Sequence, residues 1–129
     1  MPVARDHMSR DLLTVDSSLP LAEVAARMVD RSVGAVLVLE GERLVGILTE
    51  RDVLRAVARG IRDDAVVHEW MTTDPDTIDP DETTEHAATM MMHGGFRHLP
   101  VTEGGAVVGI LSIRDLMALA LADSAPRGV

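Results

Sequence analysis

The sequence contains no cysteine. Disulfide bonds, a thiolate nucleophile and a cysteine-based zinc site are therefore excluded. No apolar run approaches the roughly 18–20 residues that a membrane-spanning helix needs, and the N-terminus shows no signal-peptide pattern. Together these absences predict a cytoplasmic protein that does not enter a membrane.

Basic charge and aromatic residues are also scarce. The formal net charge is −9 at pH 7, and Trp70 and Phe96 are the only residues of the Phe, Trp and Tyr types. Binding to a phosphate backbone needs a basic face, and proteins that bind single strands stack the bases on aromatic rings. We therefore expect no nucleic-acid partner.

The sequence repeats itself internally. When it is shifted by 63 residues, residues 3–58 align with residues 66–121 without a gap, and 16 of the 56 pairs are identical. A unit of about 60 residues is near the lower limit for independent folding, so two units that bury a shared face are expected. We predict two domains, residues 1–62 and residues 63–129, that together form one module.

Each repeat predicts the element order β-α-β-β-α, a mixed α/β (α+β) fold whose two units are related by a pseudo-two-fold axis. In the first repeat a short strand is expected at 12–15, and a helix is expected after Pro20. The apolar stripe of that helix consists of Leu21, Val24, Ala25, Met28 and Val29. Two apolar runs, 33–39 and 44–48, predict a buried hairpin, and a second helix is expected from about residue 50 to 59.

Both repeats contain the same strand-to-helix motif. It reads Gly46-Ile47-Leu48-Thr49-Glu50-Arg51-Asp52 in the first repeat and Gly109-Ile110-Leu111-Ser112-Ile113-Arg114-Asp115 in the second. One interpretation is a capping pair, in which the hydroxyl and the acid stabilise the first turn of the helix. The other is a nucleotide site, because helix N-termini bind phosphate and an aspartate can accept two ribose hydroxyls. The residues alone leave both interpretations open.

The last predicted helix, residues 113–122, is apolar on nearly every face. Such a helix is normally buried, and a small protein has little interior in which to bury it. We therefore expect a partner subunit to cover this helix, with Leu116 and Leu119 as anchors, so that the protein is a homodimer.

Metal and catalytic sites are not expected. His86 and His93 lie seven residues apart, without the i, i+4 spacing or the neighbouring acid that a metal site needs. The sequence contains no Gly-x-Ser-x-Gly motif and no Walker-type glycine loop. We assign no catalytic residue, no metal and no catalytic cofactor, and we do not expect an enzyme.

The repeated motif resembles that of a pair of cystathionine-β-synthase (CBS) domains, over residues 3–121. The supporting segments are Met8-Ser9, Met71-Thr72, Ser32-Val33-Gly34-Ala35-Val36 and Phe96-Arg97-His98-Leu99-Pro100-Val101. The resemblance implies a regulatory module that binds adenosine-containing ligands in clefts between the two units and acts on a partner protein in trans. AMP, ADP, ATP, S-adenosylmethionine and NAD-type molecules are the candidate ligands, and dimers are also implied.

The resemblance assigns residues to two clefts. The first cleft combines Asp115 on the ribose, Ser112 near the phosphate, Arg97 and His98 as phosphate charges, and Leu13, Val33 and Gly34 around the adenine. The second combines Asp52 and Thr49 with Asp76, Phe96 and Arg97.

The two clefts are not expected to be equivalent. Where the second repeat offers Arg97 and His98, the first repeat has Gly34 and Ala35, and Asp76 replaces an apolar residue at the adenine rim. We therefore expect the cleft of Asp115 to bind more tightly. A structural or dimerisation module without ligand is the alternative that the sequence leaves open.

Overall fold

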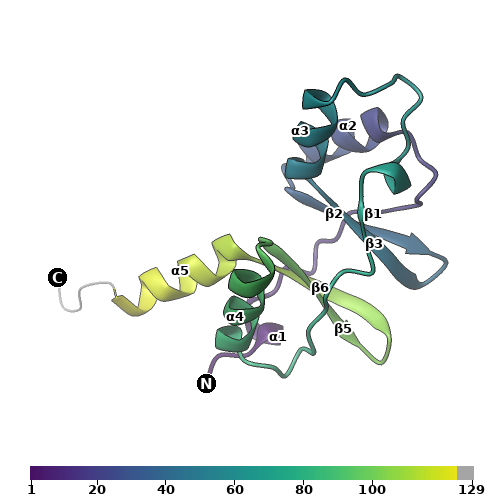
Figure 1. Ribbon diagram of the computed structural model, residues 1–129. Helices are drawn as coiled ribbons and strands as arrows, with labels where there is room; N and C mark the ends of the chain where they lie inside the picture. The colour runs from purple at the N-terminus through teal and green to yellow at the C-terminus, as the bar shows by residue number, and fades with distance from the viewer. Residues whose placement is uncertain (125–129) are drawn as a thin grey trace. The chain divides into compact units, whose positions relative to one another are not determined.

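The computed structural model describes residues 1–124, and the side chains of residues 1–122. The helices and strands follow the order drawn in Figure 1. They are α1 (Ala4–His7), β1 (Thr14–Val15), α2 (Leu21–Arg31), β2 (Ala35–Glu40), β3 (Arg43–Thr49), α3 (Glu50–Ala58), the 3-10 helix η1 (Val67–Glu69), β4 (Thr72–Thr73), α4 (Thr84–Gly94), β5 (His98–Glu103), β6 (Ala106–Ser112) and α5 (Ile113–Ser124). The predicted mixed α+β fold, with the same element order in each repeat, is confirmed.

The first compact unit consists of residues 11–75 and is called here the Asp52 unit. Its sheet has the strand order β1-β2-β3-β4, with β1 parallel to β2 and the other pairs antiparallel. Helices α2 and α3 pack on this sheet (Figure 1). The core contains Leu21, Val24 and Met28 of α2 and Ala56 of α3, packed with the apolar residues of β2 and β3.

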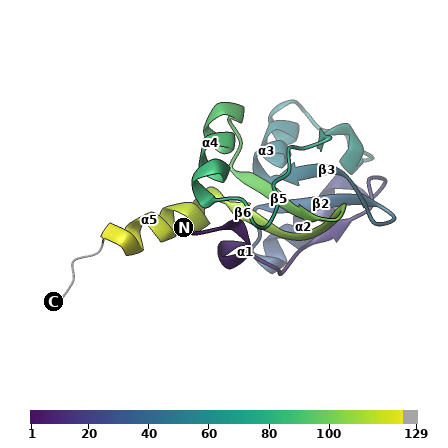
Figure 2. The same cartoon turned by 90° about the horizontal axis from the view of Figure 1, so that it is seen from below.

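The second compact unit consists of residues 1–10 and the chain from Asp76 onward, and is called here the Asp115 unit. Strands β5 and β6 form its hairpin. Two single bridges extend the hairpin, Ile78 to Val101 on one edge and Ser9 to Ile110 on the other. Figure 2 shows α5 running beyond the hairpin of its own unit, while α4 packs beside that hairpin.

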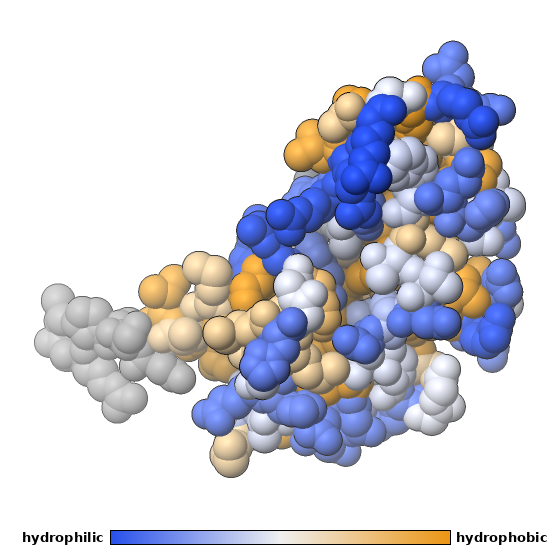
Figure 3. All heavy atoms as spheres, in the orientation of Figure 1, coloured by the Kyte–Doolittle hydropathy of each residue, from blue (hydrophilic) through white to orange (hydrophobic). Residues whose placement is uncertain are grey.

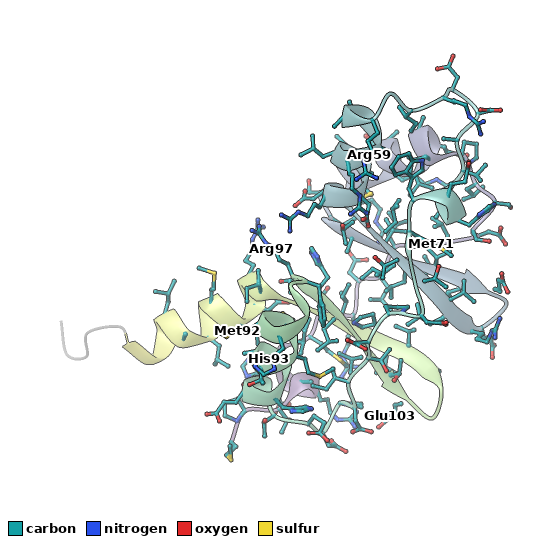
Figure 4. The ribbon with its side chains drawn as sticks, in the orientation of Figure 1. Arg59, Met71, Met92, His93, Arg97 and Glu103 are labelled. Carbon is teal, nitrogen blue, oxygen red and sulfur yellow. The ribbon has the colours of Figure 1, made fainter. Side chains whose placement is uncertain are left out.

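The opening segment of each repeat completes the sheet of the other repeat. Met8, from the first repeat, packs on Gly109, and its counterpart Met71 packs on Gly46 beside β3 (Figure 4). A Cβ at either glycine would come too close to the sulfur of that methionine, so glycine allows the close approach and a larger residue would make the methionine shift. The predicted boundary at residue 62 follows the sequence repeat, whereas the compact units exchange these segments and have different bounds.

The structure differs from the sequence-based expectations at three places. The four-residue helix α1 was not predicted, because one turn is too short to show a periodic pattern. Val29 was placed in the buried stripe of α2 but is 77% exposed. Leu116, expected on a surface that a second copy covers, is already partly buried against the core of its own unit, and its role in a dimer stays a prediction.

The helices of the described chain are all too short or too polar to cross a membrane.

Candidate functional site

Thr49 and Asp52 form a complete capping box at the start of α3. The backbone N–H of Asp52 donates to Thr49 Oγ1 at 3.3 Å, and the backbone N–H of Thr49 donates to Asp52 Oδ2 at 2.8 Å. The Thr49 hydroxyl also donates to Oδ2, at 3.0 Å. These contacts confirm the capping interpretation for the first repeat, and they occupy one oxygen of the carboxylate.

Arg55 occupies the other oxygen of the same carboxylate. Its Nη2 atom lies 2.5 Å from Asp52 Oδ1, one helical turn further along α3. The Asp52 side chain is only 7% exposed, whereas that of Arg55 is 46% exposed. Both carboxylate oxygens of Asp52 are therefore bonded within α3 and its cap.

Ser112 and Asp115 make the equivalent cap at the start of α5, but the carboxylate is less occupied. The Ser112 backbone N–H donates to Asp115 Oδ2 at 2.8 Å, and the Asp115 backbone N–H donates to Ser112 Oγ at 3.1 Å. The position that corresponds to Arg55 is Ala118, which has no charge to offer. Among the described side chains, none donates a hydrogen bond to Oδ1 of this half-buried aspartate.

Arg97 and His98 lie next to this cap. His98 pairs with Ser112 across the β5–β6 hairpin, and the Ile113 backbone N–H donates to the carbonyl oxygen of Arg97 at 2.8 Å. Figure 4 shows the Arg97 side chain extending into solvent beside the N-terminal end of α5. The Asp115 unit thus gathers an available carboxylate oxygen, a hydroxyl, the positive end of a helix dipole and an exposed guanidinium.

The first repeat offers no comparable charge next to its cap. There the Glu50 backbone N–H donates to the carbonyl oxygen of Gly34 at 3.0 Å, and Ala35 pairs with Thr49. Glycine and alanine therefore stand where the second repeat has Arg97 and His98.

The remaining predicted residues are divided between the units. In the Asp52 unit, Leu13 is a buried core residue and Val33 packs against the same core. In the Asp115 unit, Phe96 packs against the core and Asp76 is exposed. Each predicted cleft combines residues of both units, so these combinations remain predictions.

Sequence reasoning missed Arg55. Its signal is simple, because a residue three positions after an acid lies on the same face of a helix and can reach it. The motif ends at the aspartate. Three residues after it, the first repeat has Arg55 and the second repeat has Ala118.

Groups of three or more potential metal ligands are absent from the part of the chain that the structure describes.

Comparison with known proteins identifies the class of protein. A family model described as the CBS domain matches residues 4–59 and again residues 67–122. These two matches cover most of the chain, which therefore belongs to the CBS domain family, as a tandem pair.

Two curated relatives are longer than this chain. An uncharacterized 17.7 kDa protein of Acidianus ambivalens is 39% identical over 112 residues, which are 84% of this chain and 66% of the relative. A protein of Methanocaldococcus jannaschii, MJ1225, is 30% identical over 116 residues, which are 89% of this chain and 41% of the relative. The chain thus spans less than two thirds of the length of both.

Solved structures of CBS domain proteins have the same fold. The CBS domain pair of protein MJ0100, in complex with 5′-methylthioadenosine and S-adenosyl-L-methionine, is 25% identical with a TM-score of 0.88, over 95% of this chain and 98% of that one. The CBS domain protein PAE2072 of Pyrobaculum aerophilum, complexed with AMP, is 28% identical with a TM-score of 0.83, over 94% of this chain and 98% of that one. All three of these ligands contain an adenosine or a 5′-substituted adenosine.

The hydroxyl groups of Ser112 and Thr49 differ in their ability to donate a hydrogen bond to a phosphate oxygen. Thr49 donates its hydroxyl hydrogen to Asp52, whereas Ser112 Oγ donates to no described residue, so we expect its hydrogen to be available for a phosphate oxygen. We expect Ser112→Ala to weaken the binding of AMP and to leave the binding of adenosine almost unchanged. Calorimetry with both ligands measures the difference.

The matched control is Thr49→Ala. This change should cost about 1 kcal/mol of stability through the lost cap and should leave the affinity for AMP unchanged. Equal losses of AMP and adenosine affinity in Ser112→Ala would contradict a phosphate contact and leave the serine with its capping role.

Proposed function

We propose that this CBS domain pair is a regulatory module that binds an adenosine-containing ligand and signals its presence to a partner protein in trans. Support for the ligand class comes from the similar CBS pairs solved with AMP, 5′-methylthioadenosine and S-adenosylmethionine. No catalytic residue is assigned, because the hydrogen bonds of Ser112 and Asp115 serve the cap of α5.

The observation that carries this proposal is the available oxygen of Asp115. Oδ2 is fixed by the backbone N–H of Ser112, which orients the carboxylate, and Oδ1 accepts no hydrogen bond from a described side chain. A ribose offers two neighbouring hydroxyl donors, and hydrogen bonds to a charged acceptor are about twice as strong as neutral ones. Asp115 is therefore suited to hold the ribose.

The phosphate end of the ligand is assigned to the groups around the start of α5. Ser112 contributes a hydroxyl, and the N-terminus of α5 contributes its dipole. Arg97 contributes a guanidinium, which matches a phosphate with two parallel donors. His98 pairs with Ser112 on the hairpin and is the second candidate for the phosphate charge.

The other predicted residues keep secondary roles in the proposal. Leu13, Val33 and Gly34 are assigned to the adenine of one ligand, and Asp76 and Phe96 to the rim of a second site whose ribose acid is Asp52. Since both oxygens of Asp52 are already bonded, this second site is proposed to be the weaker one.

We also propose that the protein is a homodimer. Large apolar side chains are exposed at equivalent positions of the two repeats: Val29 and Met92 are 77% and 78% exposed, and Leu54 and Met117 are 69% and 57% exposed. Figure 3 shows residues of hydrophobic type over part of α5. A surface that recurs in both repeats suits a second copy of the chain, because isologous dimers pair identical surfaces.

A panel of thermal shifts tests the proposed function. The candidate compounds are AMP, ADP, ATP, S-adenosylmethionine and NADH. A ligand present at 100 times its dissociation constant stabilises the folded protein by about 2.7 kcal/mol, so at least one compound should raise the midpoint of unfolding clearly. A panel without any shift would favour the alternative function, a structural or dimerisation module without ligand.

A further inference from the structure

We infer that Arg55 masks Asp52, so that the chain offers one ribose-binding carboxylate although its sequence contains two. This inference rests on the proposed function and names the residue that sets the number of ligands bound. The two repeats carry the same motif up to the aspartate, and they differ three residues further on, where the first has Arg55 and the second has Ala118.

The contacts of Asp52 use both of its carboxylate oxygens. Thr49 donates twice to Oδ2, from its backbone N–H and its hydroxyl, and Arg55 donates to Oδ1 at 2.5 Å. The residue is 5% exposed, so there is little room for a further donor beside these three. Oδ2 cannot be released without breaking the cap of α3, which leaves Oδ1 as the only oxygen that a ligand could gain.

A ribose that approaches Oδ1 has to compete with Arg55 for this buried oxygen. The exchange replaces a charge-assisted hydrogen bond from a cation by hydrogen bonds from neutral hydroxyls, and cationic donors make the stronger bonds to a carboxylate. Asp115 has no such competitor, because Ala118 occupies the position equivalent to Arg55. Oδ1 of Asp115 accepts no hydrogen bond from a described side chain. A ribose at Asp115 therefore meets no competing donor among the described side chains.

Charge in the surroundings works in the same direction. Arg97 stands beside the cap of α5 and is exposed, with no ion pair to a described residue, whereas its counterpart beside the cap of α3 is Gly34. In the first repeat the cation sits on the helix and is directed at the acid. In the second repeat the cation, Arg97, lies directly before β5 and makes no bond to the acid among the described contacts.

The test exchanges the two residues between the repeats. Calorimetry with AMP should give one binding event per chain for the wild type. Arg55→Ala should add a second event, and the further change Asp52→Ala in that variant should remove it again. Conversely, Ala118→Arg should weaken the original event at least tenfold, because the new arginine can reach Asp115.

Two matched variants separate masking from a simple loss of charge. Arg51→Ala removes the same charge from the exposed surface of the same helix, where no described side chain pairs with it, and should keep one event. Arg55→Lys retains the charge next to Asp52 and should also keep one event.

The outcomes distinguish this inference from the proposed function. An Arg55→Ala protein that is folded by circular dichroism and still shows one event, or loses the original event, overturns the masking. In the latter case Arg55 contacts the ligand. A wild type that binds neither AMP nor S-adenosylmethionine overturns the proposed function, whereas a wild type with one event that Arg55→Ala leaves at one event overturns only the masking.

Discussion

Replacing Asp115 by alanine is expected to weaken the binding of AMP by ten- to a hundredfold. The reason is that each hydrogen bond to a charged carboxylate contributes about 1.5–3 kcal/mol, and 1.4 kcal/mol corresponds to a factor of ten in affinity. Because Asp115 also caps α5, the measurement needs a variant that keeps the cap. Asp115→Asn retains an oxygen for the Ser112 backbone N–H but removes the charge, and it should lose most of the affinity with little loss of stability.

The matched variant in the other repeat is Asp52→Ala. It should destabilise the protein, because Asp52 is buried and closes the cap of α3, at a cost of about 0.5–2 kcal/mol for a lost cap. It should nevertheless leave the tight binding of AMP intact. If Asp52→Ala removed the tight event and Asp115→Ala spared it, the assignment of the two sites would be reversed.

Replacing Met117 by glutamate is expected to convert the proposed dimer into a monomer. Met117 is 57% exposed and matches Leu54 in the first repeat, so both are candidates for the contact with a second copy. A carboxylate that is buried without a partner costs several kcal/mol, which is enough to dissociate a dimer at micromolar concentration. Light scattering at tens of micromolar measures the mass before and after the change.

The control for the dimer experiment is Thr77→Glu. Thr77 is an exposed polar residue outside the helices, so the same charge is added away from the proposed apolar contact, and the dimer should persist. A wild type that is already monomeric at this concentration would contradict the proposed homodimer.

The parts of the fold that local patterns specify could be predicted from the sequence. The hairpin of β2 and β3 follows from two apolar runs around a glycine turn, and the cap at Thr49 and Asp52 follows from a hydroxyl residue and an acid at the required spacing. The repeat then predicted the equivalent elements of the second half. The donors and acceptors of both caps lie within four residues of one another, which explains why the sequence was sufficient there.

The parts that depend on distant contacts could not be predicted. The pairing of Ser9 with Ile110, and the packing of Met8 on Gly109, join residues about a hundred positions apart. Either opening segment has the pattern to complete either sheet, so the repeat alone does not reveal the exchange. The burial of residues in α2 and α5 was also predicted incompletely. The sequence pattern marks apolar positions, but it does not say which of them remain exposed, as Val29 and Met117 do.

The central claim is that the carboxylate of Asp115 holds the ribose hydroxyls of an adenosine-containing ligand. Four titrations test it most directly: AMP and 2′,3′-dideoxy-AMP, each with the wild type and with Asp115→Ala. We predict that removing the two hydroxyls weakens binding to the wild type by ten- to a hundredfold, or about 1.4–2.8 kcal/mol, and changes binding to Asp115→Ala very little. An equal loss with both proteins would show that the hydroxyls and Asp115 act independently, and would contradict the claim.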